Sequence, residues 1–266
     1  MEVLVKAARI SYGIMIAGLG VQQIFYGNFR PVILPPWPLS FPGQVFCVYF
    51  AGFVLISAGL IIAFTSKARM VALVLGSLFL LLIVFCQALY EFKFDQYYGH
   101  LGSWAFALKE LAFAGGGFAV AGSIPIGKAD RERQLKVIRI LEKLIPYGGV
   151  FFCITMICFG IAHFLYTKFV SVLVPAWIPG ANFWTWFAGA ALILSGIAII
   201  LKIQLKLSAL LLALMIFLWL IVLHIPRAVA DPYSLQGNEI SGVFEAFGFS
   251  GIAYLIACGY HAKKVF

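Results

Sequence analysis

Eight long apolar segments constrain this chain more than any other feature of its sequence. A helix needs about 20 mostly apolar residues to cross the hydrocarbon core of a bilayer, and unpaired backbone polar groups are not tolerated in lipid. We therefore predict an all-α integral membrane protein with eight transmembrane helices. The predicted spans are residues 10–27, 44–64, 70–90, 103–122, 147–167, 183–201, 207–225 and 241–260.

The composition agrees with this prediction. Apolar residues make up 63% of the chain and charged residues 11%, whereas soluble domains are roughly 45–50% apolar and about 25% charged. The first apolar segment leads into further spans, not into a small-residue cleavage site, so we expect no cleavable signal peptide. The connecting segments are too short to contain a soluble domain.

The net charge of +9 is distributed unevenly along the chain. If the helices alternate in direction, 14 of the 19 Lys and Arg residues fall on the side that holds both termini, the two basic turns and the central linker. The opposite loops contain only Arg30, Lys93, Lys168 and Arg227, and Lys109 lies within a span. Since basic residues concentrate in cytoplasmic loops, both termini are predicted to be cytoplasmic. The basic charge then reflects topology, and we expect no nucleic-acid partner.

The chain contains an internal repeat. A shift of 140 residues places GVQQIFYGNFRPVILPPWP (20–38) on GIAHFLYTKFVSVLVPAWI (160–178). Small slips then align YFAGFVLISAGLIIAF with WFAGAALILSGIAIIL, and ELAFAGG with EAFGFSG. Each repeat has an even number of spans, so both enter the membrane in the same direction. We predict two tandem four-helix bundles in parallel orientation.

Three segments follow from this repeat. Residues 1–126 form the first unit, 127–146 a basic cytoplasmic linker, and 147–266 the second unit. Apolar residues recur at helical spacing in the second half of the linker, which predicts an amphipathic helix lying on anionic lipid or, as the alternative, docking a partner protein. Each unit also has a Pro-Trp phrase after its first helix, VILPPWPLSFPG and VLVPAWIPG. Tryptophan favours the membrane interface, so the phrase predicts a lipid anchor, a flap over the outer end of the bundle, or both.

Ionisable residues inside the spans of the second unit suggest a functional site, because such residues are costly in lipid. His163, His224 and Glu245 are all expected near the outer ends of their helices. Tyr166 follows His163 by three residues and shares its helix face. Arg227 is a candidate counter-ion for Glu245.

The first unit has neutral residues at two of the three matching positions. Gln23 and Gln87 replace the histidines, while Glu110 keeps the carboxylate, with Lys109 beside it as a candidate counter-ion. The repeat therefore predicts a polar pocket in each unit, with imidazoles in only one.

Several chemistries fit two histidines and a carboxylate. They include a metal site, proton transfer to a quinone, a haem held by the two histidines, and hydrogen bonding of a small polar ligand or lipid head group. A buried polar network that only orients the helices is a further alternative. The three residues come from separate helices without a ligand-spacing motif, so no metal site is assigned. None of the five cysteines forms a CxxC pair.

The run GIAHFLYTKFVSVLVPAWIPGANFWTWFAGAALILSGIAIIL (160–201) resembles the DoxX-like family of four-helix membrane proteins. Members share a Gly and a His late in the first helix, a Pro-x-Trp-x-Pro loop and a Gly-rich second helix. The second unit matches more closely, and the repeat extends the resemblance to most of the chain as a tandem duplication. Many relatives place a Glu in the second helix where this chain has Leu55 and Leu192.

This resemblance implies several functions. The family and its relatives include a subunit of a thiosulfate:quinone oxidoreductase, membrane partners of thiol and superoxide defence enzymes, a maturation factor for methylamine dehydrogenase and a receptor-assembly chaperone. We expect a bacterial inner-membrane subunit of a redox system that passes electrons from a periplasmic sulfur or thiol donor to quinone with a partner protein. Alternatives are a non-catalytic scaffold or assembly factor, and a small-molecule binding or transport protein.

In the redox hypothesis each residue has an expected role. Glu245 and His224 relay protons and His163 binds a quinone carbonyl, while Trp177 and Tyr166 limit the entry of water. The chain has no cofactor motif that would carry the electrons, so the hypothesis needs a partner subunit.

Overall fold

The computed structural model describes residues 2–36, 42–127 and 134–259. Within these residues it is entirely helical, and eight helical segments are long and apolar enough to cross a membrane. The predicted all-α membrane fold is therefore confirmed. The helices of the spans are α1 Glu2–Tyr26, α2 Gln44–Phe64, α3 Ala68–Leu82, α4 Ala88–Phe94, α5 Ala105–Ser123, α8 Gly148–Leu165, α10 Ala181–Ile200, α11 Leu205–Trp219, α12 Ile225–Ala230 and α13 Asn238–Ala257.

The helices form an inner and an outer group. The first and fourth spans of each unit, α1, α5, α8 and α13, are the inner group, in which 44–67% of the most apolar window is buried. The second and third spans, α2, α3, α10 and α11, are the outer group, in which only 28–39% is buried. The outer helices therefore present most of the lipid-facing surface.

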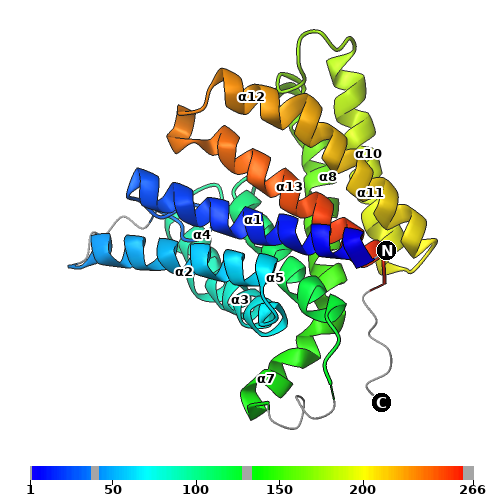
Figure 1. Ribbon diagram of the computed structural model, residues 1–266. Coiled ribbons are helices and arrows are strands. Elements are labelled where there is room, and N and C mark those ends of the chain that lie inside the picture. The colour runs from blue at the N-terminus through cyan, green and yellow to red at the C-terminus, as the bar shows by residue number, and fades with distance from the viewer. Residues whose placement is uncertain (1, 37–41, 128–133, 260–266) are drawn as a thin grey trace.

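The inner helices pack across the boundary between the repeats. In Figure 1 the first helix, α1 (dark blue), lies beside the last, α13 (red), and the contacts between helices place α5 against α8 in the same way. Within the first unit, the Tyr12 hydroxyl on α1 donates a hydrogen bond of 2.8 Å to the Phe113 carbonyl on α5. The ring of Phe249 on α13 lies 5.9 Å from that of Phe113 and 5.7 Å from that of Phe152. The two units thus share one core.

Glycines at matching positions bring the first two helices of each unit together. A Cβ atom on Gly20 of α1 would lie 2.7 Å from the carbonyl oxygen of Gly52 on α2, and one on Gly160 of α8 would lie 2.6 Å from that of Gly189 on α10. Both distances are too short for any side chain. Since small residues allow close helix packing in lipid, the matching glycines allow a close approach of these two helices in both units.

The third span of each unit is interrupted by one π-helical turn. The turns are Ile83–Gln87, between α3 and α4, and Leu220–His224, between α11 and α12. Each ends at a predicted pocket residue, Gln87 or His224. A π turn adds one residue to a helical turn and so rotates the residues that follow, and such turns are frequent at functional sites.

The described part of the linker after the gap, residues 134–146, is mostly helical. It contains α7 Lys136–Leu141, followed by a 3₁₀ turn over Glu142–Tyr147 that leads into α8. Arg69 pairs with Glu142 at 2.7 Å and anchors this turn to the start of α3. Val137 and Ile140 expose 62% and 61% of their surface, and the placement of this helix on lipid stays a prediction. Linker residues 128–133 and Trp37 and Pro38 of the first Pro-Trp phrase lie outside the described residues.

Candidate functional site

A cavity of about 410 Å³ lies at the loop-rich end of the second unit. His163 on α8, His224 at the end of the π turn and Glu245 on α13 all line it. Its remaining walls are largely apolar and aromatic, formed by side chains that include Phe159, Leu173, Trp184, Trp219 and Phe249. The three residues that the sequence singles out in the second unit thus meet in one space.

The tautomer of His163 follows from its hydrogen bond. Its Nδ1 atom lies 2.7 Å from the Phe159 carbonyl oxygen, one turn earlier on α8. A carbonyl oxygen only accepts, so Nδ1 carries the proton in this bond. In the neutral ring, Nε2 is then free to accept a hydrogen bond from a ligand, and in the protonated ring it donates one.

His224 lies against a glycine on the neighbouring helix. A Cβ atom at Gly242 of α13 would be 3.1 Å from Nδ1 of His224. Within the described residues the imidazole makes no hydrogen bond, so both of its nitrogens are available to a ligand or to water in the cavity. The lack of a side chain at residue 242 leaves space for the ring.

The first unit contributes a cation to the second unit's cavity. Lys109 of α5 lines the cavity, and its Nζ lies 2.7 Å from Oε2 of Glu245, with side-chain exposures of 23% and 7%. The expectation that Lys109 neutralises Glu110 is therefore wrong. Cross-repeat packing of α5 and α13 brings Lys109 to the carboxylate of the other unit, and the pairing is needed because an isolated charge is costly to bury.

Arg227 does not pair with Glu245, contrary to expectation. It donates two hydrogen bonds to Glu239 on α13, of 2.8 Å from Nε to Oε2 and 2.6 Å from Nη2 to Oε1. Both residues line the cavity. The cavity therefore contains two compensated ion pairs, Lys109–Glu245 and Arg227–Glu239, and among the described residues that line it the two imidazoles are the only other ionisable groups. Such a lining suits a ligand that is polar but uncharged.

Two predicted residues lie outside this cavity. The Tyr166 hydroxyl accepts a hydrogen bond of 3.1 Å from the backbone N–H of Gly102, in the loop before α5. Trp177 is 72% exposed and lines a separate groove between α10 and α11. Trp184 and Trp219, which the sequence analysis did not predict as site residues, contribute to the aromatic wall of the cavity instead of Tyr166 and Trp177.

The matching residues of the first unit are bonded to the chain itself. The Gln23 amide donates to the Val48 carbonyl, and the Gln87 amide donates to the Pro31 carbonyl, both at 2.8 Å. Glu110 is fully buried, and within the described residues neither of its carboxyl oxygens has a hydrogen-bond partner.

The loop after α1 folds inward and accounts for this difference between the units. Val32 and Ile33 are 3% and 6% exposed and belong to the hydrophobic core. At the position matching Val32, the second unit has Val172, which is 72% exposed. The first unit's loop thus packs into its bundle, whereas the equivalent loop of the second unit stays at the surface beside the cavity.

Arg30, in the same loop, attaches the first unit to the start of α13. Its Nη1 donates to the Gln236 carbonyl at 2.7 Å and its Nη2 to the Ser241 hydroxyl at 2.9 Å. The Gln22 amide adds a bond of 2.9 Å to the Gly237 carbonyl. Burial lowers the pKa of Arg30, but arginine stays protonated in proteins. Arg30 therefore helps to hold the helix that contributes Glu239 and Glu245.

No metal centre is formed by the described residues: no three His, Cys, Asp or Glu side chains are grouped so that they could hold an ion. His163, His224 and Glu245 line one cavity without forming such a group. The five cysteines are all unpaired, and none of them lines the cavity.

Comparisons with protein-family models, with curated protein sequences and with solved structures give no match to this chain. Membership of the DoxX-like family therefore stays a prediction.

Proposed function

We propose that this protein is the quinone-binding membrane subunit of a redox system. The observation that carries the proposal is the convergence of His163, His224 and Glu245 on one cavity of about 410 Å³. A membrane quinone has an uncharged planar head with two carbonyl oxygens. The cavity offers apolar and aromatic walls for the ring and polar groups for the oxygens, which is the usual make-up of a small-molecule site.

The polar groups have complementary capacities. The Lys109 ammonium has three protons, and its only ion pair in the described residues is the one with Glu245, so a further proton is available for a quinone carbonyl. His163 presents Nε2 as an acceptor in its neutral form and as a donor in its protonated form. The pocket is thereby able to bind both the quinone, which accepts hydrogen bonds, and the quinol, which also donates them.

The proposed reaction needs two electrons and two protons for each quinone. With a thiol donor on a partner protein, two thiols and one quinone give one disulfide and one quinol, which balances atoms and electrons. An imidazole accepts a proton on one ring nitrogen and donates from the other, so His224 is proposed to pass protons to the quinone oxygens together with Glu245. No cysteine lines the cavity, so the thiols belong to the partner, at the periplasmic face of a bacterial inner membrane with both termini cytoplasmic.

Binding of a membrane amphiphile without electron transfer is a second candidate function. No cysteine lines the cavity, so the cavity has no thiol that could itself exchange electrons with a ligand. This observation favours binding without electron transfer. In this alternative the same residues hold the polar head of the ligand, and no redox partner is required.

The repeat provides the substitutions for a binding test. His163→Gln and His224→Gln introduce the residues that the first unit has at these positions. We expect each to weaken binding of a ubiquinone to the purified protein in lipid nanodiscs about tenfold, the loss of roughly one good hydrogen bond. His100→Gln, in an exposed loop, is the matched control and should bind like the wild type. If wild-type protein binds no quinone, the proposed function is wrong.

A second experiment separates the two candidates. Purification from native membranes in mild detergent, followed by mass spectrometry, identifies proteins that remain bound in stoichiometric amount. A redox protein whose thiol oxidation reduces quinone, and fails to do so with the His224→Gln variant, would support the redox subunit. Quinone binding without such a partner would leave the amphiphile-binding protein.

A further inference from the structure

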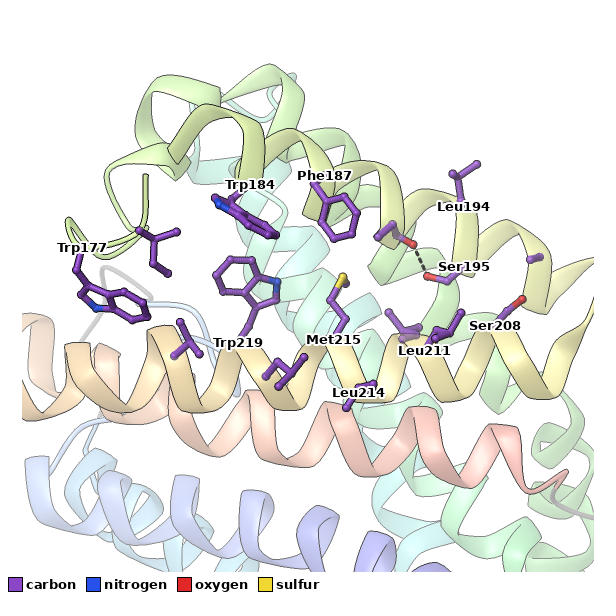
Figure 2. Close-up of a pocket in the computed structure, with 16 residues that line it drawn as sticks. Trp177, Trp184, Phe187, Leu194, Ser195, Ser208, Leu211, Leu214, Met215 and Trp219 are labelled. Carbon is purple, nitrogen blue, oxygen red and sulfur yellow. Dashed lines mark hydrogen bonds between the residues drawn. The ribbon is translucent and has the colours of Figure 1, made fainter. Parts of the chain in front are cut away.

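A second hollow lies on the lipid-facing side of the second unit, between α10 and α11. This groove has a volume of about 810 Å³ and is drawn in Figure 2. Apart from Ser195 and Ser208, its lining side chains are apolar or aromatic, and many are half exposed, among them Phe187 (49%), Leu194 (66%) and Leu211 (56%). Ser195 donates its hydroxyl proton to the Ala191 carbonyl, so it leaves no unpaired donor in the groove.

The groove and the polar cavity share a wall. Trp184 of α10 and Met215 and Trp219 of α11 line both spaces. The two indole rings face each other from opposite helices, with centroids 6.4 Å apart and planes at 77° (Figure 2). Three side chains, two of them rings that turn about their χ angles and one a flexible methionine, therefore border both the lipid-facing groove and the cavity that contains the ionisable residues.

The dimensions suit a long hydrocarbon chain. The lining residues on α10 extend from Trp184 to Ala198, which at 1.5 Å per residue corresponds to about 21 Å along the helix. The hydrocarbon core of a bilayer is about 30 Å thick. The groove thus runs along much of the core, and its Trp184 end adjoins the cavity.

We infer that the quinone enters the cavity sideways from the bilayer between α10 and α11, and that its isoprenoid tail occupies the groove while its head lies beside His163 and His224. Trp184 and Trp219 form the portal between the two spaces. The inference rests on the proposed quinone-binding function and adds the route of entry and the class of ligand: a neutral head with a long apolar tail. The compensated ion pairs of the cavity favour such a head over the charged head group of a phospholipid.

The test compares ligands with and without a tail. Ala191→Trp and Ala198→Trp fill the groove, and neither residue lines the cavity. Ile197→Trp, at a 41% exposed position of α10 outside the groove, is the matched control. Binding to protein in nanodiscs is measured for a ubiquinone whose isoprenoid tail is long enough to reach from Trp184 past Ala198, and for its tail-less head group. We expect the groove variants to bind the tailed quinone roughly tenfold more weakly, because the indole displaces the tail from its packing contacts, and to bind the tail-less head like the wild type.

The outcomes distinguish the inference from the function on which it rests. Equal effects of the groove variants on both ligands, or no effect on either, would overturn the inference while quinone binding stands. Failure of wild-type protein to bind either ligand would overturn both. A measurement on the wild type avoids any folding defect of the variants: a quinone with a diazirine at the tail end should label peptides from residues 194–211, and labelling confined to other helices would refute the placement of the tail.

Discussion

Replacement of Lys109 by methionine tests the cross-repeat ion pair most directly. At the 2.7 Å separation of Nζ and Oε2, the gross attraction is about 6 kcal/mol for an effective dielectric constant of 20. The cost of removing both ions from water offsets part of it, and loss of one partner of a buried pair typically costs about 3–5 kcal/mol. Because the Lys109 side chain is 23% exposed, we expect the lower end, about 3 kcal/mol.

Thermal unfolding in detergent measures this loss. Cys153 is fully buried, whereas the other four cysteines are half-buried. In a background in which those four are replaced by alanine, the reaction of Cys153 with a thiol-reactive fluorophore on heating reports the opening of the core. A loss of about 3 kcal/mol corresponds to a Tm roughly 6–10 °C lower for a chain of this size. The double variant Lys109→Met/Glu245→Gln has no unpaired charge and should lose only about 1 kcal/mol.

Lys93→Met, at an exposed position, is the control and should melt within about 2 °C of the wild type. If Lys109→Met melts like this control, or if the double variant melts lower than Lys109→Met, the pair does not support the fold and the reasoning fails.

Three further changes test other parts of the structure. Gly160→Leu should lower the free energy of unfolding by about 3 kcal/mol or more, seen as a lower Tm, because a Cβ atom there would lie 2.6 Å from the Gly189 carbonyl oxygen. Gly242→Val should weaken quinone binding several-fold at nearly unchanged Tm, because its side chain crowds the His224 ring; unchanged binding would remove this ring from the site. Arg30→Met should cost about 2–4 kcal/mol and speed hydrogen exchange at the start of α13, where its guanidinium donates two hydrogen bonds; unaltered exchange there would contradict the role of Arg30.

The candidate site was predictable in part. Ionisable residues are rare inside apolar segments because burying them in lipid costs free energy, so such residues stand out in the sequence. The position of each residue along its helix gives its depth in the membrane, and this was enough to place His163, His224 and Glu245 at one depth. Depth does not say which helix faces which. The partner of Lys109 and the wall formed by Trp184 and Trp219 depend on which helices are neighbours. The sequence does not determine the neighbours, because the apolar faces of the different helices have similar composition.

What the sequence by itself determined is the set of spans, the all-helical fold and the glycines that allow close crossings, because the bilayer fixes the length and the backbone pairing of whatever crosses it. Only the tertiary structure decided that α1 lies against α13 and α5 against α8, that the loop with Val32 and Ile33 enters the first bundle, and that the cavity is in the second. The physical reason is that lipid is as apolar as the helix faces, so hydrophobicity does not choose helix partners and the choice falls to close packing and to a few polar contacts.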